Sequence, residues 1–211
     1  MKNRYVETHK TWNKIAQSYQ DKFMKLGLYN DTYMRFCNLL PKANASVLEI
    51  GCGPGNITRH ILDLNPKLTI LATDISKNMV DLAKRNNPEV ETQVLDCRNL
   101  QSINAKFDGI ICGFTIPYIS KNDCSKLIFN CSNLLKEDGT LYLSFVAGHY
   151  KKSGFISGSS GGRVYFYYHE LTRIIQDLES NQITVVDVIQ KEYEKLDSVS
   201  ETHTIIIAKK C

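Results

Sequence analysis

The sequence lacks the long apolar run that a membrane-spanning helix requires. No segment approaches the roughly 20 consecutive apolar residues that cross a bilayer. The opening residues, MKNRY at positions 1–5, are followed by polar residues and not by the apolar core of a signal peptide. We therefore expect no membrane partner.

The cysteines form no recognisable motif. The seven cysteines are scattered, and no Cys-x-x-Cys pair or Cys/His cluster has the spacing of a zinc site. Cys52, Cys97 and Cys112 lie within or beside segments that we expect to be strands. The pattern predicts no bound metal, and it favours a reducing, cytoplasmic compartment.

The sequence also has no block of like charge, such as a nucleic-acid-binding tail would show. Lys and Arg number 26 and Asp and Glu number 22, which gives a net charge of +4. This small basic excess slightly favours acidic partners. The dispersed charges argue against nucleic acid as the partner.

What is present is a regular alternation of strands and helices. The length of 211 residues fits one α/β domain over 1–211. It would begin with a helical cap at 1–42, made of helices at 5–24 and 29–40. Short strands are then expected at 46–50, 68–73, 92–95, 107–112 and 141–146, and helices at 56–64, 77–86 and 123–135. This alternation predicts a doubly wound, mostly parallel sheet with helices on both faces.

The last third of the chain departs from this alternation. Gly139 stands where a helix-to-strand turn is expected, and the Gly- and Ser-rich segment 147–163 shows no regular pattern. Such a long loop is usually disordered or functional, and we expect a flexible lid that closes over bound ligand. After a helix at 169–178, strands at 183–188 and 203–208 follow without a helix between them, which predicts an antiparallel pair.

The strongest functional signal is the segment VLEIGCGPGN at 47–56, a buried strand that runs into a glycine turn and a helix. Glycines allow a sharp turn and the close approach of a ligand. Ligands of open α/β sheets bind beyond the carboxyl ends of the strands. The ligand could be a dinucleotide or S-adenosylmethionine (SAM). The Gly-x-Gly-x-Gly spacing and the acidic Glu49 favour a cationic ligand such as SAM.

Two acidic residues follow the next two strands. Asp74 can accept hydrogen bonds from both ribose hydroxyls, which fits NAD and SAM equally. Ile75 and Met79 could sandwich an adenine ring, although Met79 fits a core position equally well. Asp96, followed by Cys97, can accept a hydrogen bond from an adenine amino group. An acid after the third strand favours SAM over NAD.

Taken together, these segments resemble the successive motifs of class I SAM-dependent methyltransferases. The similarity is greatest to the small-molecule type related to the ubiquinone and menaquinone biosynthesis methyltransferases. It includes WNKIAQSY at 12–19, similar to the family's opening helix, and LLKEDGTL at 134–141, similar to the segment before its fifth strand. The resemblance implies a Rossmann-like sheet of seven strands with the last strand antiparallel.

The resemblance also implies a cofactor, SAM, and the residues that bind it. The glycines would border its methionine half, Asp74 would hold the ribose, Asp96 and Cys97 the adenine, and the end of the fourth strand the transferred methyl. The full predicted set is Tyr19, Glu49, Gly51, Cys52, Gly53, Gly55, Asn56, Asp74, Ile75, Met79, Asp96, Cys97, Gly113 and Phe114.

The expected reaction is in-line displacement by a small organic acceptor. A sulfonium methyl is already electrophilic, so alignment and exclusion of water can suffice without a catalytic acid or base. If a general base acts, the candidates are Tyr118, His149 and His169, although each fits a structural role better. The acceptor pocket is expected to be aromatic and to be lined by Tyr29, Tyr33, Tyr118, Phe155 and Tyr165.

Three other functions remain open from the sequence. An RNA-modifying methyltransferase would fit the net charge, but the lysines form no basic stripe. A SAM-binding protein without catalysis would carry the same motifs. An NAD-dependent oxidoreductase ranks third, because the glycine spacing, Glu49 and Asp96 argue against it. The chain is expected to be a monomer or a weak homodimer.

Overall fold

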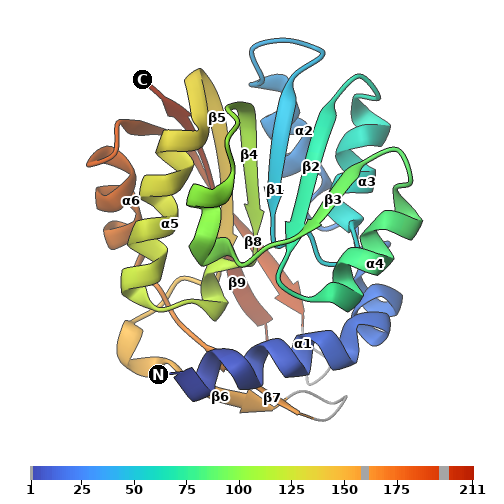
Figure 1. Ribbon diagram of the computed structural model, residues 1–211. Coiled ribbons are helices and arrows are strands. Elements are labelled where there is room, and N and C mark those ends of the chain that lie inside the picture. The colour runs from blue at the N-terminus through green and yellow to red at the C-terminus, as the bar shows by residue number, and fades with distance from the viewer. Residues whose placement is uncertain (1, 158–161, 195–199) are drawn as a thin grey trace.

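The computed structural model describes residues 2–157, 162–194 and 200–211, and it contains one large sheet (Figure 1). The sheet has seven strands in the order β3-β2-β1-β4-β5-β9-β8. These strands are β1 (Ser46–Ile50), β2 (Thr69–Asp74), β3 (Glu91–Val94), β4 (Phe107–Gly113), β5 (Leu135–Phe145), β8 (Ile183–Glu194) and β9 (Ser200–Lys210). Strands β1 to β5 pair in parallel, whereas β9 is antiparallel to both β5 and β8. The predicted Rossmann-like sheet with an antiparallel last strand is confirmed.

Helices cover both faces of the sheet because successive strand residues point to opposite sides. Leu48 of β1 packs into a core cluster with α5 (Lys121–Leu134) and α6 (Leu171–Glu179). Val47 packs into a second cluster on the other face, with α2 (Asn30–Asn38) and α3 (Asn56–Leu64). Along the chain, α4 (Lys77–Asn86) connects β2 to β3. Ser76 caps this helix, since its hydroxyl accepts a hydrogen bond from the Met79 N–H.

The long helix α1 (Lys2–Phe23) crosses the end of the sheet at which β1 to β4 finish (Figure 1). It lies along a two-stranded hairpin, β6 (Gly154–Ser157) and β7 (Arg163–Phe166). The Thr11 hydroxyl donates to the Arg163 carbonyl at 2.8 Å, and the Tyr165 N–H donates to the Thr8 hydroxyl at 2.9 Å. The helix and the hairpin therefore form a small layer across the carboxyl ends of the parallel strands (Figure 1).

This hairpin corrects the prediction of an irregular loop over 147–163. A 3-10 turn (Tyr150–Lys152) and β6 occupy much of that segment, and β6 pairs in register with β7. In β6 the strand formers Phe155 and Ile156 are flanked by Gly and Ser, so the four-residue strand left no clear pattern, and pairing with β7 stabilises it. Residues 158–161 of the predicted lid lie outside the described residues. Closure over a ligand stays a prediction.

The turn expected at Gly139 is placed differently. Strand β5 begins directly after α5, and Gly139 lies inside it. The backbone turns at Asp138, whose φ is +60°, where the pairing of β4 with β5 shifts register. A Cβ on Gly139 would stand 2.8 Å from the Lys136 carbonyl oxygen, so glycine is required by this tight irregularity and not by a helix end.

Candidate active site

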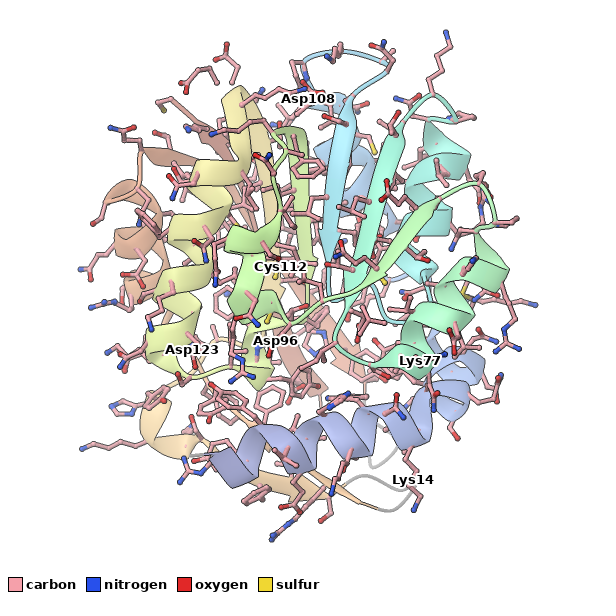
Figure 2. The ribbon with its side chains drawn as sticks, viewed as in Figure 1. Lys14, Lys77, Asp96, Asp108, Cys112 and Asp123 are labelled. Carbon is pink, nitrogen blue, oxygen red and sulfur yellow. The ribbon has the colours of Figure 1, made fainter. Side chains whose placement is uncertain are left out.

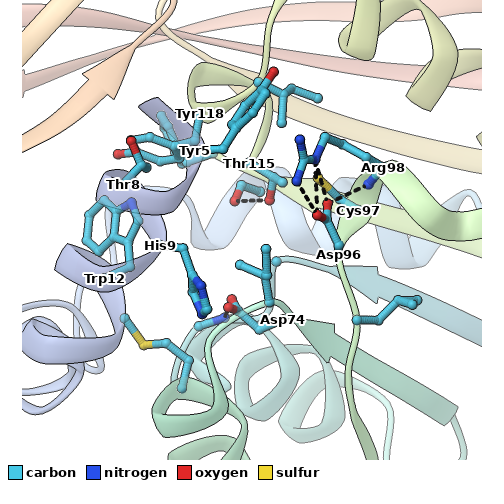
Figure 3. Close-up of a pocket in the computed structure, with 18 of the residues that line it drawn as sticks. Tyr5, Thr8, His9, Trp12, Asp74, Asp96, Cys97, Arg98, Thr115 and Tyr118 are labelled. Carbon is cyan, nitrogen blue, oxygen red and sulfur yellow. Dashed lines mark hydrogen bonds and ion pairs between the residues drawn. The ribbon is translucent and has the colours of Figure 1, made fainter. Parts of the chain in front are cut away.

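A pocket lies at the carboxyl ends of the parallel strands, between them and α1 (Figure 3). Most of the predicted cofactor residues line it, which places the ends of four strands and one face of α1 around a common space. These residues are Tyr19, Gly51, Gly53, Asp74, Ile75, Met79, Asp96, Cys97, Gly113 and Phe114. The motifs that the sequence spreads over about a hundred positions therefore meet at one edge of the sheet.

The three glycines of the turn have different structural tasks, although all have positive φ values. A Cβ on Gly51 would stand 2.0 Å from the Thr115 hydroxyl oxygen, and one on Gly55 would stand 2.3 Å from Asn87 Nδ2. A Cβ on Gly53 would meet only Tyr19 Cε1, at 3.7 Å, and would point into the pocket. Gly51 and Gly55 thus serve the packing of the protein, whereas Gly53 leaves space for a ligand.

Asp74 ties the glycine turn to the end of β2. Its carboxylate accepts hydrogen bonds from the Gly53 N–H at 3.0 Å and the Ser76 N–H at 2.8 Å. Burial raises the pKa of Asp74, and these two N–H groups and the nearby His9 partly offset the effect. Each carboxylate oxygen keeps acceptor capacity for a ligand hydroxyl.

Asp96 is held by a neighbour that the sequence analysis left without a role. The Arg98 guanidinium donates to both Asp96 carboxylate oxygens, with a shortest distance of 2.5 Å, and the Arg98 N–H donates at 2.9 Å. Burial would raise the pKa of Asp96, but the bonds from Arg98 outweigh it and leave that pKa below its usual value. Arg98 also lies over the Tyr5 ring, 4.1 Å from its centroid.

Some predicted cofactor residues do not line the pocket: Glu49, Cys52, Gly55 and Asn56. Glu49 is 1% exposed, and its Oε2 accepts a 2.5 Å hydrogen bond from the Thr58 hydroxyl. Burial raises the pKa of Glu49 to about 8, so the carboxyl is largely protonated at neutral pH. The negative charge that we expected to face a cationic ligand is therefore suppressed by desolvation in this structure.

The wall of the pocket that sequence reasoning missed belongs mainly to α1. Tyr5, Thr8, His9 and Trp12 all line the pocket, together with Tyr19. Their spacing of three or four residues places them on one helix face. That spacing is the signal in the sequence that could have found them. Leu95, Thr115 and Ile119 complete the missed residues.

Beyond Gly113 the pocket becomes aromatic. Phe114 adopts a left-handed conformation with φ of +51°, which is uncommon for a residue with a bulky side chain. The Trp12 ring meets the Tyr118 ring edge to face at 5.1 Å and the Tyr19 ring at 5.5 Å. Figure 3 shows Trp12, Tyr118 and Thr8 gathered at this end, away from Asp96 and Arg98.

Several predicted acceptor and catalytic residues lie elsewhere. His149 is exposed and faces Glu170 at 3.7 Å, whereas His169 is buried and bonds the Ile116 carbonyl at 2.9 Å. Tyr29 and Tyr33 pack into the core between α2 and the sheet. The expectation that Tyr29, Tyr33, Phe155 and Tyr165 line the pocket is wrong. The rings of Tyr29 and Tyr33 pack in the core, and those of Phe155 and Tyr165 pack against each other in the hairpin. Of these candidates, Tyr118 alone lines the described pocket.

The described residues contain no group of His, Cys, Asp or Glu arranged to hold a metal ion. Among the same residues, no helix is long and apolar enough to span a membrane. The fold and the pocket together define a domain of the class I SAM-dependent methyltransferase type. Its features are the glycine turn after β1 and the acidic residues at the ends of β2 and β3.

Comparison with known proteins identifies the family. Residues 47–139 match a family described as a methyltransferase domain. The chain is 30% identical over 190 residues to the malonyl-[acyl-carrier protein] O-methyltransferase of Priestia megaterium, covering 83% of this chain and 66% of that protein. It is 24% identical over 198 residues to the demethylmenaquinone methyltransferase of Thermotoga maritima, covering 86% of this chain and 85% of that protein. The chain belongs to the class I SAM-dependent methyltransferases.

Solved structures share the fold. A SAM-dependent methyltransferase from Clostridium acetobutylicum superposes with a TM-score of 0.69 at 20% identity, covering 95% of this chain and 99% of that chain. The 1,6-didemethyltoxoflavin-N1-methyltransferase of Burkholderia thailandensis gives a TM-score of 0.73 at 15% identity, covering 97% and 88%. Several curated relatives are longer proteins. The chain spans 40% of the malonyl-[acyl-carrier protein] O-methyltransferase of Acetivibrio thermocellus, for example.

Proposed function

We propose that this chain transfers a methyl group from SAM to a small organic acceptor. The observation that carries the proposal is the pocket itself, which joins a polar end at Asp74 and Asp96 to an aromatic end at Trp12 and Tyr118. Gly53 and Gly113 line the same pocket. A nucleoside would fit the polar end, and a flat or partly apolar acceptor would fit the aromatic end.

The residues present fit SAM by two features of their own geometry. Gly53 leaves open space where a side chain would stand, so a ligand can lie against the backbone. Asp74 is held in place by two protein N–H groups and keeps acceptor capacity toward ribose hydroxyls. Asp96, whose two oxygens accept from Arg98, is assigned to the adenine end of the ligand. We assign the methionine half to Gly51, Gly53 and Tyr19.

When bound, SAM supplies an electrophilic methyl group on sulfur. The protein then needs to align the acceptor with that methyl and to exclude water, which α1 favours by covering the pocket. Phe114, held in its left-handed conformation, forms the wall where the two ligands would meet. Because α1 completes the site, we propose that residues 1–211 work as one catalytic unit.

The acceptor class is proposed from the site and supported by relatives. The names of two relatives specify a malonyl-[acyl-carrier protein] and a demethylmenaquinone as the methylated compounds. The aromatic end of this pocket suits an acceptor with a flat or partly apolar organic group.

The test is a calorimetric titration of SAM and of NAD into the purified protein. We expect saturable SAM binding, no NAD binding, and a loss of about 10- to 100-fold in SAM affinity for Asp74→Asn, because that change removes a charged hydrogen-bond acceptor. The control is Asp63→Asn, since Asp63 is exposed on α3 and distant from the pocket. A folded wild-type protein that does not bind SAM would refute the proposal.

A further inference from the structure

A buried hydrogen-bond donor without a partner lies in the aromatic end of the pocket. Trp12 lines the pocket, and its indole Nε1 is buried with no hydrogen-bond partner among the described residues. An indole N–H can only donate. A buried donor left unpaired is destabilising, so this group favours a ligand atom that accepts a hydrogen bond.

A second donor accompanies it. The Tyr118 ring meets Trp12 edge to face at 5.1 Å and comes from the turn (Ile116–Tyr118) that directly follows the end of β4 (Figure 3). Burial, and then the neighbouring Tyr19 and Glu201, hold the pKa of Tyr118 well above its usual value. Its hydroxyl therefore keeps its proton at neutral pH and is available as a donor.

Both donors belong to residues that line the pocket, and Figure 3 shows Trp12 apart from Asp96 and Arg98, with His9 beside Asp74. Tyr19 contacts both Trp12 and the glycine turn: its ring meets the Trp12 ring at 5.5 Å, and its Cε1 lies 3.7 Å from the Cβ position of Gly53. We assign Tyr19 to the methionine half of SAM, which leaves Trp12 and Tyr118 for the acceptor.

We propose that Trp12 and Tyr118 together anchor an oxygen atom of the methyl acceptor, which is therefore a carboxylate, carbonyl or phenol compound and not an amine. This inference rests on the proposed function, because it concerns the second substrate of the same site. The chemical reason is that the indole N–H can only donate. An oxygen atom offers it two lone pairs, whereas an amine nitrogen offers at most one and also carries N–H groups that the indole cannot accept. The anchored oxygen can be the methylated atom or its neighbour.

The experiment compares two matched probes, catechol and 1,2-phenylenediamine, titrated into protein saturated with S-adenosylhomocysteine. We expect the wild type to bind catechol about 10-fold more tightly than the diamine, because only the oxygens accept from both donors. Trp12→Phe and Tyr118→Phe should each lower catechol affinity about 5- to 10-fold while SAM affinity stays unchanged. Tyr168→Phe is the matched control, since Tyr168 does not line the pocket.

The outcomes separate this inference from the proposed function. Absence of SAM binding in the wild type would refute both. Normal SAM binding with equal or absent binding of the two probes would overturn the oxygen anchor alone. A Trp12→Phe variant that loses SAM affinity instead of catechol affinity would assign the indole to the cofactor and also overturn it. If Trp12→Phe does not fold, Tyr118→Phe carries the same test.

Discussion

The two ends of the pocket are built in different ways. At the nucleoside end, Asp74 is the last residue of β2 and Asp96 comes two residues after β3, and both are held by N–H groups no more than about twenty positions away in sequence. At the acceptor end, Trp12 of α1 packs on Tyr118, which lies more than a hundred positions later. The nucleoside end is formed by the turns that follow the strands, whereas the acceptor end forms only when α1 is docked.

The difference extends to the kind of interaction. The nucleoside end depends on backbone conformation and hydrogen bonds, as at Gly53 and Asp74. The acceptor end depends on ring contacts and on side-chain bonds that fasten α1, such as the bond from Tyr5 to Asp123. Changes at the first end should therefore affect cofactor binding, and changes at the second should affect α1 docking and acceptor binding.

The largest expected effect concerns Glu49, which is buried in β1 behind the nucleoside end. Its pKa is raised to about 8, chiefly by burial, so the folded state holds a proton that the unfolded chain releases above its ordinary pKa. The free energy of unfolding therefore falls as pH rises from about 5 to about 8. Glu49→Gln, which resembles the protonated acid, should be spared this loss.

The measurement is urea unfolding of both proteins at pH 5.5, 7 and 8. The advantage of the variant over the wild type should grow with pH to the order of a few kcal/mol. Glu137→Gln is the control, because the Glu137 side chain is 76% exposed. A stability difference between Glu49→Gln and the wild type that does not change with pH would contradict the prediction.

Gly53→Ala should produce the next largest effect. The added methyl would occupy the open space of the pocket at a φ of +54°, which is strained for any residue with a side chain. We expect SAM affinity to fall by about 100-fold, the sum of steric loss and backbone strain. Gly154→Ala is the control, since nothing lies within 4 Å of its Cβ position. SAM affinity is measured by calorimetry. Equal losses of affinity in the two variants would contradict the role of Gly53 in leaving space for the ligand.

Tyr5→Phe tests the docking of α1, and it keeps the ring that lies against Arg98 in the pocket. The Tyr5 hydroxyl donates to Asp123 at 2.5 Å and accepts from the Ser120 N–H at 2.8 Å, which fastens α1 to the start of α5. Its loss should lower the free energy of unfolding by about 1.5–3 kcal/mol, the range for bonds to charged groups. SAM affinity should remain close to that of the wild type. Urea unfolding of Tyr5→Phe is compared with that of the control Tyr168→Phe. A larger effect of Tyr5→Phe on SAM affinity than on the free energy of unfolding would contradict the prediction.

The smallest effect is expected at the predicted lid. Lys151 and Lys152 are exposed in the turn before β6, and closure of the segment 147–163 over ligand should slow tryptic cleavage there a few-fold. Cleavage after the exposed Lys67, near the start of β2, serves as the internal control. Equal cleavage rates with and without SAM at Lys151 and Lys152 would argue against closure.

Much of the fold could be predicted because its signals are local. Strand β1 and helices α3 and α4 have the predicted boundaries, since a buried run, a glycine turn and the Ser76 cap act over a few residues. The hairpin of β6 and β7 could not be predicted in this way. Its strands are only four residues long, and they are stabilised by pairing with each other and by bonds from β7 to Thr8 and Thr11 of α1.

The candidate site likewise has residues that local sequence signals could predict and residues that they could not. Gly53, Asp74 and Asp96 could be found because each stands at a fixed offset from a strand end, and the topology of a parallel sheet brings such positions together. Tyr29 and Tyr33 were misplaced because ring contacts with the core, which no pattern of spacing records, decide where an aromatic side chain lies.

The sequence by itself determined the alternating strands and helices, the glycine turn and the acids after β2 and β3, because sterics and capping act between near neighbours. The tertiary structure alone decided that Glu49 is protonated, that Arg98 holds Asp96, and that Trp12 faces Tyr118. Desolvation and side-chain contact depend on what surrounds a residue in space. They arise only when α1 and the sheet have come together.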